Sequence, residues 1–244
     1  MRDYNQEHRD TRERKYEYDF DRLLRGYMRR SFAPFHRPGK ALELGCYKGE
    51  FTSLLAESFV DLTVVEGASD LVDIARERVG PGVKFIHATF ETVDLAPQYD
   101  SIFLIHTLEH LDDPRAVLAR IGAWLAPGGR LFVAVPNANA ASRQIAVKMG
   151  LIEHNSAVTP AERDHGHRRT YALDTLESEV GGAGLTVLSR GGVFFKPFAN
   201  FQFDRMAGTD VISADYLEGC YRLGMHYPDL CASVYTICEA GHQQ

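Results

Sequence analysis

The sequence has few cysteines, and none of them lies in a spacing that binds metal. Four cysteines occur among its 244 residues, namely Cys46, Cys220, Cys231 and Cys238. No two of them form a CxxC pair, whereas structural zinc sites and disulfide frameworks depend on such patterned spacings. Scattered cysteines are typical of reduced thiols, so we expect a cytoplasmic protein without structural zinc.

The sequence also lacks long apolar runs and an excess of positive charge. No stretch approaches the roughly 20 apolar residues that cross a membrane, and the N-terminal residues contain no apolar core of a secretory signal. The 27 lysines and arginines are outnumbered by 33 aspartates and glutamates, which gives a formal net charge of −6. Affinity for nucleic acid comes from clustered basic residues. We therefore expect neither a membrane nor a nucleic-acid partner.

What the sequence does contain is an alternation of short apolar runs and amphipathic stretches. The apolar runs predict strands at 40–44, 62–66, 83–87, 99–106, 130–136, 185–195 and 233–239. Helical spacing of apolar residues predicts helices at 49–59, 69–79, 114–126 and 172–183. This alternation is typical of an α/β fold, here a Rossmann-like, doubly wound and mostly parallel seven-stranded sheet.

The chain reads as one domain over residues 1–244, because no repeat or linker divides it. Apolar residues from Tyr16 to Met28 form one stripe of an N-terminal helix. The domain is divided into an N-terminal cap helix, a cofactor-binding core and two substrate-cap insertions, at 1–39, 40–136, 137–170 and 196–230. Open α/β sheets bind ligands at the C-terminal ends of their strands, so we expect both insertions to cover a site there.

A glycine-containing loop joins the first predicted strand to the following helix. It reads ELGCYKG from Glu43 to Gly49, and Glu66 ends the next strand. Glycines allow close approach of backbone to ligand, and a carboxylate at the end of the second strand can accept hydrogen bonds from ribose hydroxyls. No GxxxxGK[ST] phosphate loop is present. The loop is therefore compatible with a dinucleotide or with an adenosyl cofactor that lacks phosphates.

Four motifs, ELGCYKG, VVEGAS, HTLEHLDDP and LAPGGRLFVAVPN, make residues 40–136 resemble class I S-adenosylmethionine-dependent methyltransferases. The likeness extends loosely to residue 195 and is nearest to the ubiquinone-type and the sugar or natural-product branches. It implies S-adenosyl-L-methionine as methyl donor and S-adenosyl-L-homocysteine as product. A dinucleotide fits less well, since Glu43 would lie beside its pyrophosphate.

The resemblance also implies a set of cofactor-binding residues. Glu43 would orient the loop, Glu66 would bind the ribose, and the remaining positions would line the methionyl and adenine groups: Gly45, Cys46, Tyr47, Gly49, Gly67, Ala68, Thr89, Phe90 and His106. Two positions depart from the family pattern. Tyr47 replaces a glycine, so its side chain must point away from the cofactor or onto it, and Thr89 replaces an acidic residue.

Histidines are the candidate bases for removing a proton from the methyl acceptor. His106 ends the fourth strand, near the expected position of the donated methyl group, and His167 lies in the first insertion. His106 could instead only line the pocket, and Glu109 and His110 more simply stabilise the turn after it. The HxxEH spacing of His106 to His110 is that of some zinc peptidases. It needs a continuous helix and a third ligand, neither of which the sequence indicates, so no metal is expected.

The two insertions supply the candidate substrate residues. Polar or aromatic side chains that could contact an acceptor are Tyr4, Asn137, Arg143, His165 and Phe203, and Tyr16 could close over the cofactor. Each of these has a simpler alternative role in capping or packing.

We interpret the chain as an enzyme that methylates an oxygen or nitrogen atom of a small molecule, such as a sugar, nucleotide sugar or natural-product intermediate. Alternatives are carbon methylation of a quinone-like or polyketide ring, and a non-catalytic adenosylmethionine-binding protein. The sequence does not determine the oligomeric state, for which a homodimer is one hypothesis.

Overall fold

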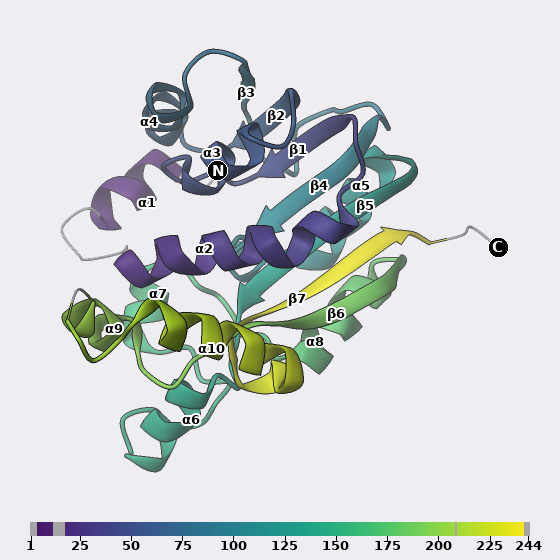
Figure 1. The fold of residues 1–244 in the computed structure, drawn as a ribbon. Coiled ribbons are helices and arrows are strands. Elements are labelled where there is room, and N and C mark those ends of the chain that lie inside the picture. The colour runs from purple at the N-terminus through teal and green to yellow at the C-terminus, as the bar shows by residue number, and fades with distance from the viewer. Residues whose placement is uncertain (1–3, 12–17, 208, 242–244) are drawn as a thin grey trace.

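The apolar runs of the sequence form one twisted sheet at the centre of the molecule (Figure 1). A computed structural model describes residues 4–11, 18–207 and 209–241. The sheet has seven strands in the order β3-β2-β1-β4-β5-β7-β6. Their bounds are β1 Lys40–Leu44, β2 Asp61–Glu66, β3 Val83–His87, β4 Tyr99–Ile105, β5 Leu125–Pro136, β6 Leu185–Phe195 and β7 Cys231–Ala240.

Six of the seven strands run in the same direction. β1 pairs in parallel with β2 and β4, β2 with β3, and β4 with β5. β7 lies between β5 and β6 and is antiparallel to both. The mostly parallel, seven-stranded sheet predicted from the sequence is confirmed, and the C-terminal ends of β1, β2, β4, β5 and β6 meet at one edge.

Helices connect the strands and cover both faces of the sheet. Those described are α1 Tyr4–Thr11, α2 Asp19–Phe32, α3 Glu50–Ala56, α4 Ser69–Val79, α5 Pro114–Trp124, α6 Ala141–Lys148, α7 Pro160–Asp164, α8 Leu173–Gly182, α9 Asn200–Met206 and α10 Ala214–His226. Short 3-10 turns follow α2, β4 and α10, at Ala33–Phe35, Leu108–His110 and Pro228–Leu230. Within the described residues, no helix is both long and apolar enough to cross a membrane.

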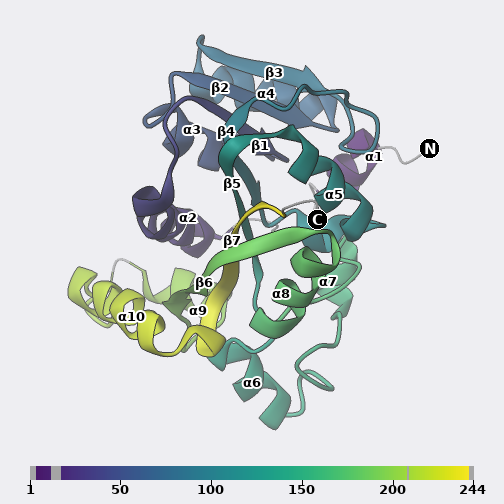
Figure 2. The same ribbon diagram turned by 90° about the vertical axis from the view of Figure 1, so that its right-hand side faces the viewer.

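Alternate strand residues point to two separate apolar cores. Leu42 and Leu44 of β1 join a core with residues of α5 and α8. Ala41 of the same strand joins a second core, with residues of α2, α3 and α10. In the second core, the rings of Phe103 and Phe132 stack with centroids 4.7 Å apart. The two groups of helices accordingly lie on opposite sides of the sheet (Figure 2).

Local sequence signals placed most helix boundaries well. The helix predicted over 69–79 is α4, and α5 begins at Pro114, where Asp113 Oδ1 accepts a hydrogen bond of 3.1 Å from the amide of Ala116. The prediction ran two residues past the end of α5, because the chain enters β5 directly at Leu125. Tyr16 lies outside the described residues. The sequence analysis did not predict α1.

Part of the second insertion covers a face of the sheet. Helix α10 packs against β6 and buries Cys220, Tyr221 and Gly224. Tyr221 also stacks on Tyr27 of α2, with ring centroids 4.7 Å apart. Helix α10, the longest helix of the 196–230 insertion, therefore covers a face of the sheet. The apolar side of α10 completes the second core. The interpretation of this segment as a cap did not include this packing.

Candidate functional site

A cavity of about 820 Å³ lies at the C-terminal edge of the parallel strands. Its size is that of a small-molecule site, and its position is the one expected for an open α/β sheet. The segments around it lie at the ends of β1, β2, β3 and β4 and in the first insertion, at 43–47, 66–68, 89–90, 105–111 and 162–168 respectively. Parts of α1 and α2 also line it.

Two glycines shape the loop beneath the cavity. Gly45 and Gly49 both have φ of 79°, a left-handed conformation that other residues rarely adopt. A Cβ atom at Gly45 would lie 2.7 Å from Oγ1 of Thr107, and one at Gly49 would lie 3.0 Å from Cα of Ala75. Only glycine therefore lets this loop turn tightly against its neighbours.

Tyr47, between these glycines, has the same left-handed backbone, with φ of 48°. This conformation costs a non-glycine residue roughly 1–2 kcal/mol, which is a physical reason for the glycine that the resembled family has at this position. The Tyr47 side chain lines the cavity, and its ring centroid is 5.0 Å from Nζ of Lys48.

Glu66 ends β2 and binds the backbone of the glycine loop. Its Oε2 accepts hydrogen bonds from the amides of Cys46 at 3.1 Å and Tyr47 at 3.4 Å, and its Oε1 accepts one from the amide of Ala68 at 3.0 Å. Burial raises the pKa of Glu66, while these hydrogen bonds lower it. Glu66 thus joins the two loops that border the cavity, a structural role in addition to the ribose contact expected from the sequence.

Glu43, near the end of β1, is a cavity-lining residue and has an unsatisfied carboxyl oxygen. Its side chain is 1% exposed, and Oε2 has no hydrogen-bond partner among the described residues. Burial and the nearby charge of Glu66 raise the pKa of Glu43 to about 8. A cationic ligand would offset both the cost of burying the Glu43 carboxylate and its repulsion by Glu66. The residues present therefore fit S-adenosylmethionine, whose ammonium and sulfonium groups are positive.

The N-terminal helix closes one end of the cavity. Asn5 of α1 binds the start of α4, donating to Oγ of Ser69 at 2.9 Å and accepting from the amide of Asp70 at 3.2 Å. A Cβ atom at Gly67 would lie 3.1 Å from the ring of Tyr4. Tyr4, predicted as a substrate residue, thus lies with Gly67 at the expected cofactor end. The other cavity-lining residues at the expected adenine position are Ala68, Thr89 and Phe90.

His106 follows β4 and lies in the cavity wall. Its backbone is left-handed, with φ of 49°, and its Nε2 forms a hydrogen bond of 2.8 Å with Oγ of Ser233 at the start of β7. Burial, with Arg25, His167 and Lys196 nearby, lowers the pKa of His106 to about 3. The imidazole is therefore neutral near pH 7.

His167 lies against the turn that follows His106. Its ring centroid is 4.7 Å from that of His110, and the ligand atoms of Glu109, His110 and His167 lie within 4.8 Å of one another. Burial raises the pKa of Glu109 to about 8 and lowers that of His167 to about 4. The sequence indicated no third ligand to join His106 and His110, whereas the structure groups His167 with Glu109 and His110. His106 is not part of this cluster, because a 3-10 turn and not a helix follows it.

Comparison with known proteins identifies the family. A family model described as "Methyltransferase domain" matches residues 12–190, well over half of the chain. The chain belongs to this methyltransferase family. The methyltransferase uses S-adenosylmethionine as its methyl donor.

Curated relatives of the methyltransferase are named ubiquinone biosynthesis O-methyltransferases. The protein from Xanthomonas euvesicatoria is 26% identical over 166 residues, which cover 66% of this chain and 68% of the relative. The one from Aeromonas salmonicida is 27% identical over 187 residues, which cover 70% and 73%.

Solved structures with the same fold include two described as N-methyltransferases. The Thermotoga maritima protein, a possible histamine N-methyltransferase, has a TM-score of 0.62 and 18% identity, with 89% of this chain and 91% of that chain covered. NodS from Bradyrhizobium japonicum in complex with S-adenosyl-L-homocysteine has a TM-score of 0.62 and 16% identity, with 98% of each chain covered.

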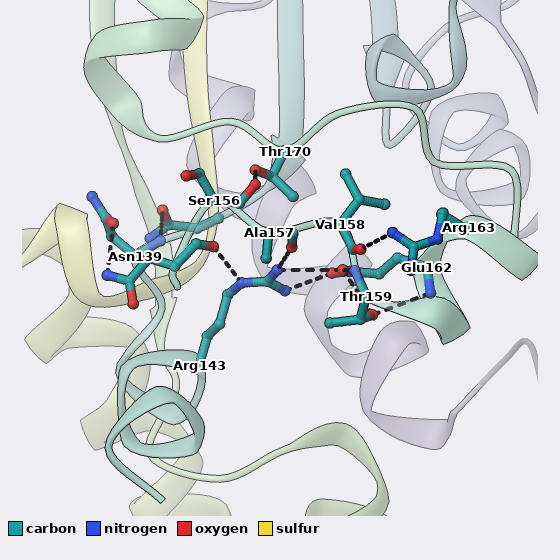
Figure 3. Close-up of polar contacts among 11 residues, drawn as sticks. Asn139, Arg143, Ser156, Ala157, Val158, Thr159, Glu162, Arg163 and Thr170 are labelled. Atoms are coloured by element: carbon teal, nitrogen blue, oxygen red, sulfur yellow. Dashed lines mark hydrogen bonds and ion pairs between the residues drawn. The ribbon is translucent and has the colours of Figure 1, made fainter. Parts of the chain in front are cut away.

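Two of the predicted substrate residues, Asn137 and Arg143, instead bind other parts of the methyltransferase chain. The side-chain amide of Asn137 donates to the carbonyls of Asp229 and Cys231, both at 2.9 Å. Arg143 binds the loop before α7, donating to the carbonyls of Asn155 and Ala157 and forming an ion pair with Glu162 at 2.6 Å (Figure 3).

Asn137 and Arg143 do not line the large cavity, so the expectation that they contact substrate is not supported. Arg143 instead fixes the segment that carries His165 and His167, which both do line it. A partly buried arginine with two carbonyl partners and an ion pair is a loop anchor, and the sequence alone does not distinguish that role from substrate binding.

Phe203 also packs in the core. It is 4% exposed and stacks on Phe20 with ring centroids 4.5 Å apart, and Phe20 is the ring of this pair that reaches the cavity. The prediction of Phe203 as an apolar wall for substrate is corrected accordingly: the aromatic cluster of the second insertion supports the wall from behind.

Sequence reasoning missed several polar residues that line the cavity, among them Asp21, Lys196 and Asn200. Lys196 directly follows β6, whose end lies at the same sheet edge as that of β4. The rule that ligands bind at this edge could have found it. Asp21 and Asn200 carry no comparable signal, because they reach the cavity only through the packing of α2 against α9.

Proposed function

We propose that this methyltransferase transfers a methyl group to an oxygen or nitrogen atom of a small molecule, such as a sugar, nucleotide sugar or natural-product intermediate. The main support is a single cavity that joins the glycine loop with Glu43 and Glu66 to a polar half containing His106, Ser233 and Lys196. Its volume of about 820 Å³ accommodates a nucleoside and a small second ligand but no macromolecule. The names of relatives and structural neighbours include both O- and N-methyltransferases.

In this proposal the chain supplies alignment, exclusion of water and a proton acceptor. The bound cofactor supplies an electrophilic methyl group. His106, held by Ser233, and His167 are both neutral near pH 7, so each has a nitrogen lone pair that can accept a hydrogen bond from the acceptor group. Their pKa values of about 3 and about 4 make them weak bases. We therefore assign them to orienting the acceptor and receiving its proton late in the transfer.

Calorimetric titration with S-adenosyl-L-homocysteine tests the cofactor part of the proposal. Wild-type protein is expected to give saturable heat. Glu66→Ala is expected to weaken binding by about 1–3 kcal/mol, through loss of hydrogen bonds to ribose. Because Glu66 also holds the amides of Cys46 and Tyr47, Glu66→Gln is the matched variant that keeps side-chain size. Absence of saturable heat with wild-type protein would refute the proposal.

Methyl transfer to a panel of hydroxylated and amino compounds, followed with methyl-labelled donor, tests the acceptor part. His106→Ala and His167→Ala are expected to lose turnover at least tenfold while cofactor affinity stays within twofold of wild type. Full turnover in both variants would contradict the histidine roles and favour carbon methylation. Cofactor binding without transfer to any compound would favour the non-catalytic alternative.

We also infer a cytoplasmic location, since all four cysteines are buried free thiols. The acidic net charge of −6 supports a small-molecule acceptor over nucleic acid. A homodimer remains a hypothesis, which light scattering of the purified protein tests.

A further inference from the structure

The topology of the sheet brings three polar residues from distant parts of the chain to one side of the cavity. His106 follows β4, Lys196 follows β6, and Ser233 lies near the start of the antiparallel strand β7, between β5 and β6. All three line the cavity. The glycine loop after β1 lines the same cavity.

Lys196 is a cation without a contacting counter-charge. In the described parts of the chain its ammonium group makes no ion pair or hydrogen bond, and its recorded contact is with the face of Phe20, whose centroid is 5.4 Å from Nζ. Burial lowers the pKa of Lys196 to about 8, and Asp21, Arg143 and Glu162 act on it electrostatically. Loss of water around an ammonium group is costly unless an anion compensates for it.

The nearby carboxylates already have other partners. Asp21 accepts hydrogen bonds from the amide of Tyr18 at 3.0 Å and from Nδ2 of Asn200 at 2.9 Å. Glu162 forms an ion pair with Arg143 and accepts a hydrogen bond from the amide of Thr159 at 2.8 Å. Neither carboxylate lies within ion-pair distance of Lys196. Lys196 therefore lines the cavity without a contacting carboxylate among the described residues.

We propose that Lys196 binds an anionic group, a carboxylate or a phosphate, on the methyl acceptor, so that the substrates of this site are acidic small molecules. This inference rests on the proposed function and names its substrate class. A bound anion would restore the interactions that Lys196 loses on burial. It would also offset the repulsion between Lys196 and a positively charged cofactor in the same low-dielectric cavity.

The test compares small aromatic ligands that differ in charge. Protein saturated with S-adenosyl-L-homocysteine is titrated at pH 7 with benzoate, phenyl phosphate and benzamide. We expect benzoate or phenyl phosphate to bind at least tenfold more tightly than benzamide. Tighter binding of benzoate would indicate a carboxylate substrate, and tighter binding of phenyl phosphate would indicate a phosphate substrate. Equal binding of all three, or no binding of either anion at 10 mM, which is roughly a tenfold excess over the Kd of a weak ligand, would overturn the proposal.

Variants then assign the effect to Lys196. Lys196→Met is expected to abolish the preference for the anion, Lys196→Arg to retain most of it, and Lys148→Met, at an exposed position of α6, to leave it unchanged. Affinity for S-adenosyl-L-homocysteine should stay within twofold of wild type in all three. If Lys196→Met still binds the anion more tightly than benzamide, the assignment to Lys196 is contradicted. If wild-type protein does not bind S-adenosyl-L-homocysteine, the proposed function is contradicted instead.

A proton-uptake measurement gives a second readout. Because an anion favours the charged form of Lys196 and raises its pKa, anion binding at pH 8 should take up about half a proton. Calorimetry in two buffers with different ionisation enthalpies measures this uptake. The groups around Lys196 that could also titrate are Asp21, Glu162 and His106, so uptake must disappear in Lys196→Met. Equal uptake in that variant would exclude Lys196 as the titrating group.

Discussion

Burial makes several side chains of this methyltransferase neutral that would be charged in water. The pKa of His106 is lowered to about 3 and that of His167 to about 4, whereas the pKa values of Glu43 and Glu109 are raised to about 8. In each case burial is the largest cause. These four cavity-lining side chains therefore carry little charge near pH 7.

His36 shows the same effect far from the cavity. Its ring packs against Phe59, Phe103 and Phe132, with centroids 5.0 to 5.5 Å apart, and its Nε2 is buried without a hydrogen-bond partner in the described residues. Burial lowers the pKa of His36 to about 4. The unfolded chain therefore binds a proton at this residue first, and stability is lost as the pH falls from about 6.5 to 4.

The replacement His36→Phe should remove both the unpaired buried nitrogen and the loss of stability at low pH. We expect the free energy of unfolding to rise by about 1 kcal/mol at pH 7, because an unsatisfied nitrogen is removed, and to rise further at pH 5. Urea denaturation at both pH values measures the change. His226→Phe, at the exposed end of α10, is the matched control and should change stability by less than about 0.5 kcal/mol. An equal effect of His36→Phe at both pH values would contradict the protonation argument.

Among single residues, those in local motifs were the ones that the sequence identified. Gly45, Gly49 and Glu66 lie where the strand–loop–helix pattern puts them. Arg143 and Phe203 were misassigned, because a side chain's type does not reveal whether it faces a cavity or a neighbouring element. That distinction depends on contacts with residues far away in the chain.

Helix α10 depends on one glycine for its packing against the sheet. A Cβ atom at Gly224 would lie 2.8 Å from Sγ of Cys231 and 2.9 Å from the amide nitrogen of Phe195. Gly219 in the same helix is exposed, and a Cβ atom there would meet no described atom within 4 Å. The two glycines therefore separate the effect of packing from that of helix propensity.

We expect opposite effects from the same substitution at these two sites. Gly224→Ala should lower the free energy of unfolding by about 1–3 kcal/mol, because α10 must move away from β6. Gly219→Ala should raise it by up to about 1 kcal/mol through higher helix propensity. Thermal and urea denaturation measure both. Stabilisation by Gly224→Ala would show that α10 is not held closely against the sheet.

Elements with strong local signals were predicted well, and elements without them were not. The proline after Asp113 and the apolar periodicity of 69–79 located α5 and α4. Helix α1 consists mostly of polar residues and rests on contacts such as those of Asn5 with α4. Helix α10 was read as part of a cap, because its apolar stripe does not say which surface it covers.

The molecule as a whole should be most stable at mildly acidic pH. The lowered pKa values of His36, His106 and His167 mean that stability is lost as the pH falls below about 6.5. The raised pKa values of Glu43 and Glu109 mean that the folded state keeps protons that the unfolded chain releases, so stability also falls as the pH rises from about 4.5 to 8. The two trends place the maximum near about pH 6.

Thermal denaturation of the cofactor-free protein between pH 4 and pH 9 tests this profile. Glu109→Gln should make the decline between pH 6 and pH 8 shallower, because one group with a raised pKa is removed. Glu218→Gln is the control: interactions with Arg30 and Arg222 lower the pKa of Glu218 to about 2, so it is ionised in both states across that range. A melting temperature that rises steadily from pH 6 to pH 8 would contradict the argument.

The sequence by itself determined the α/β alternation, the glycine turn after β1 and the carboxylate at the end of β2, because periodicity and turn chemistry are properties of neighbouring residues. Tertiary structure alone decided that β7 runs antiparallel, that α10 covers the sheet, and that Lys196, His106 and Ser233 meet across one cavity. It also decided which of the polar residues are charged there, since burial and the distance to other charges depend on how distant segments pack.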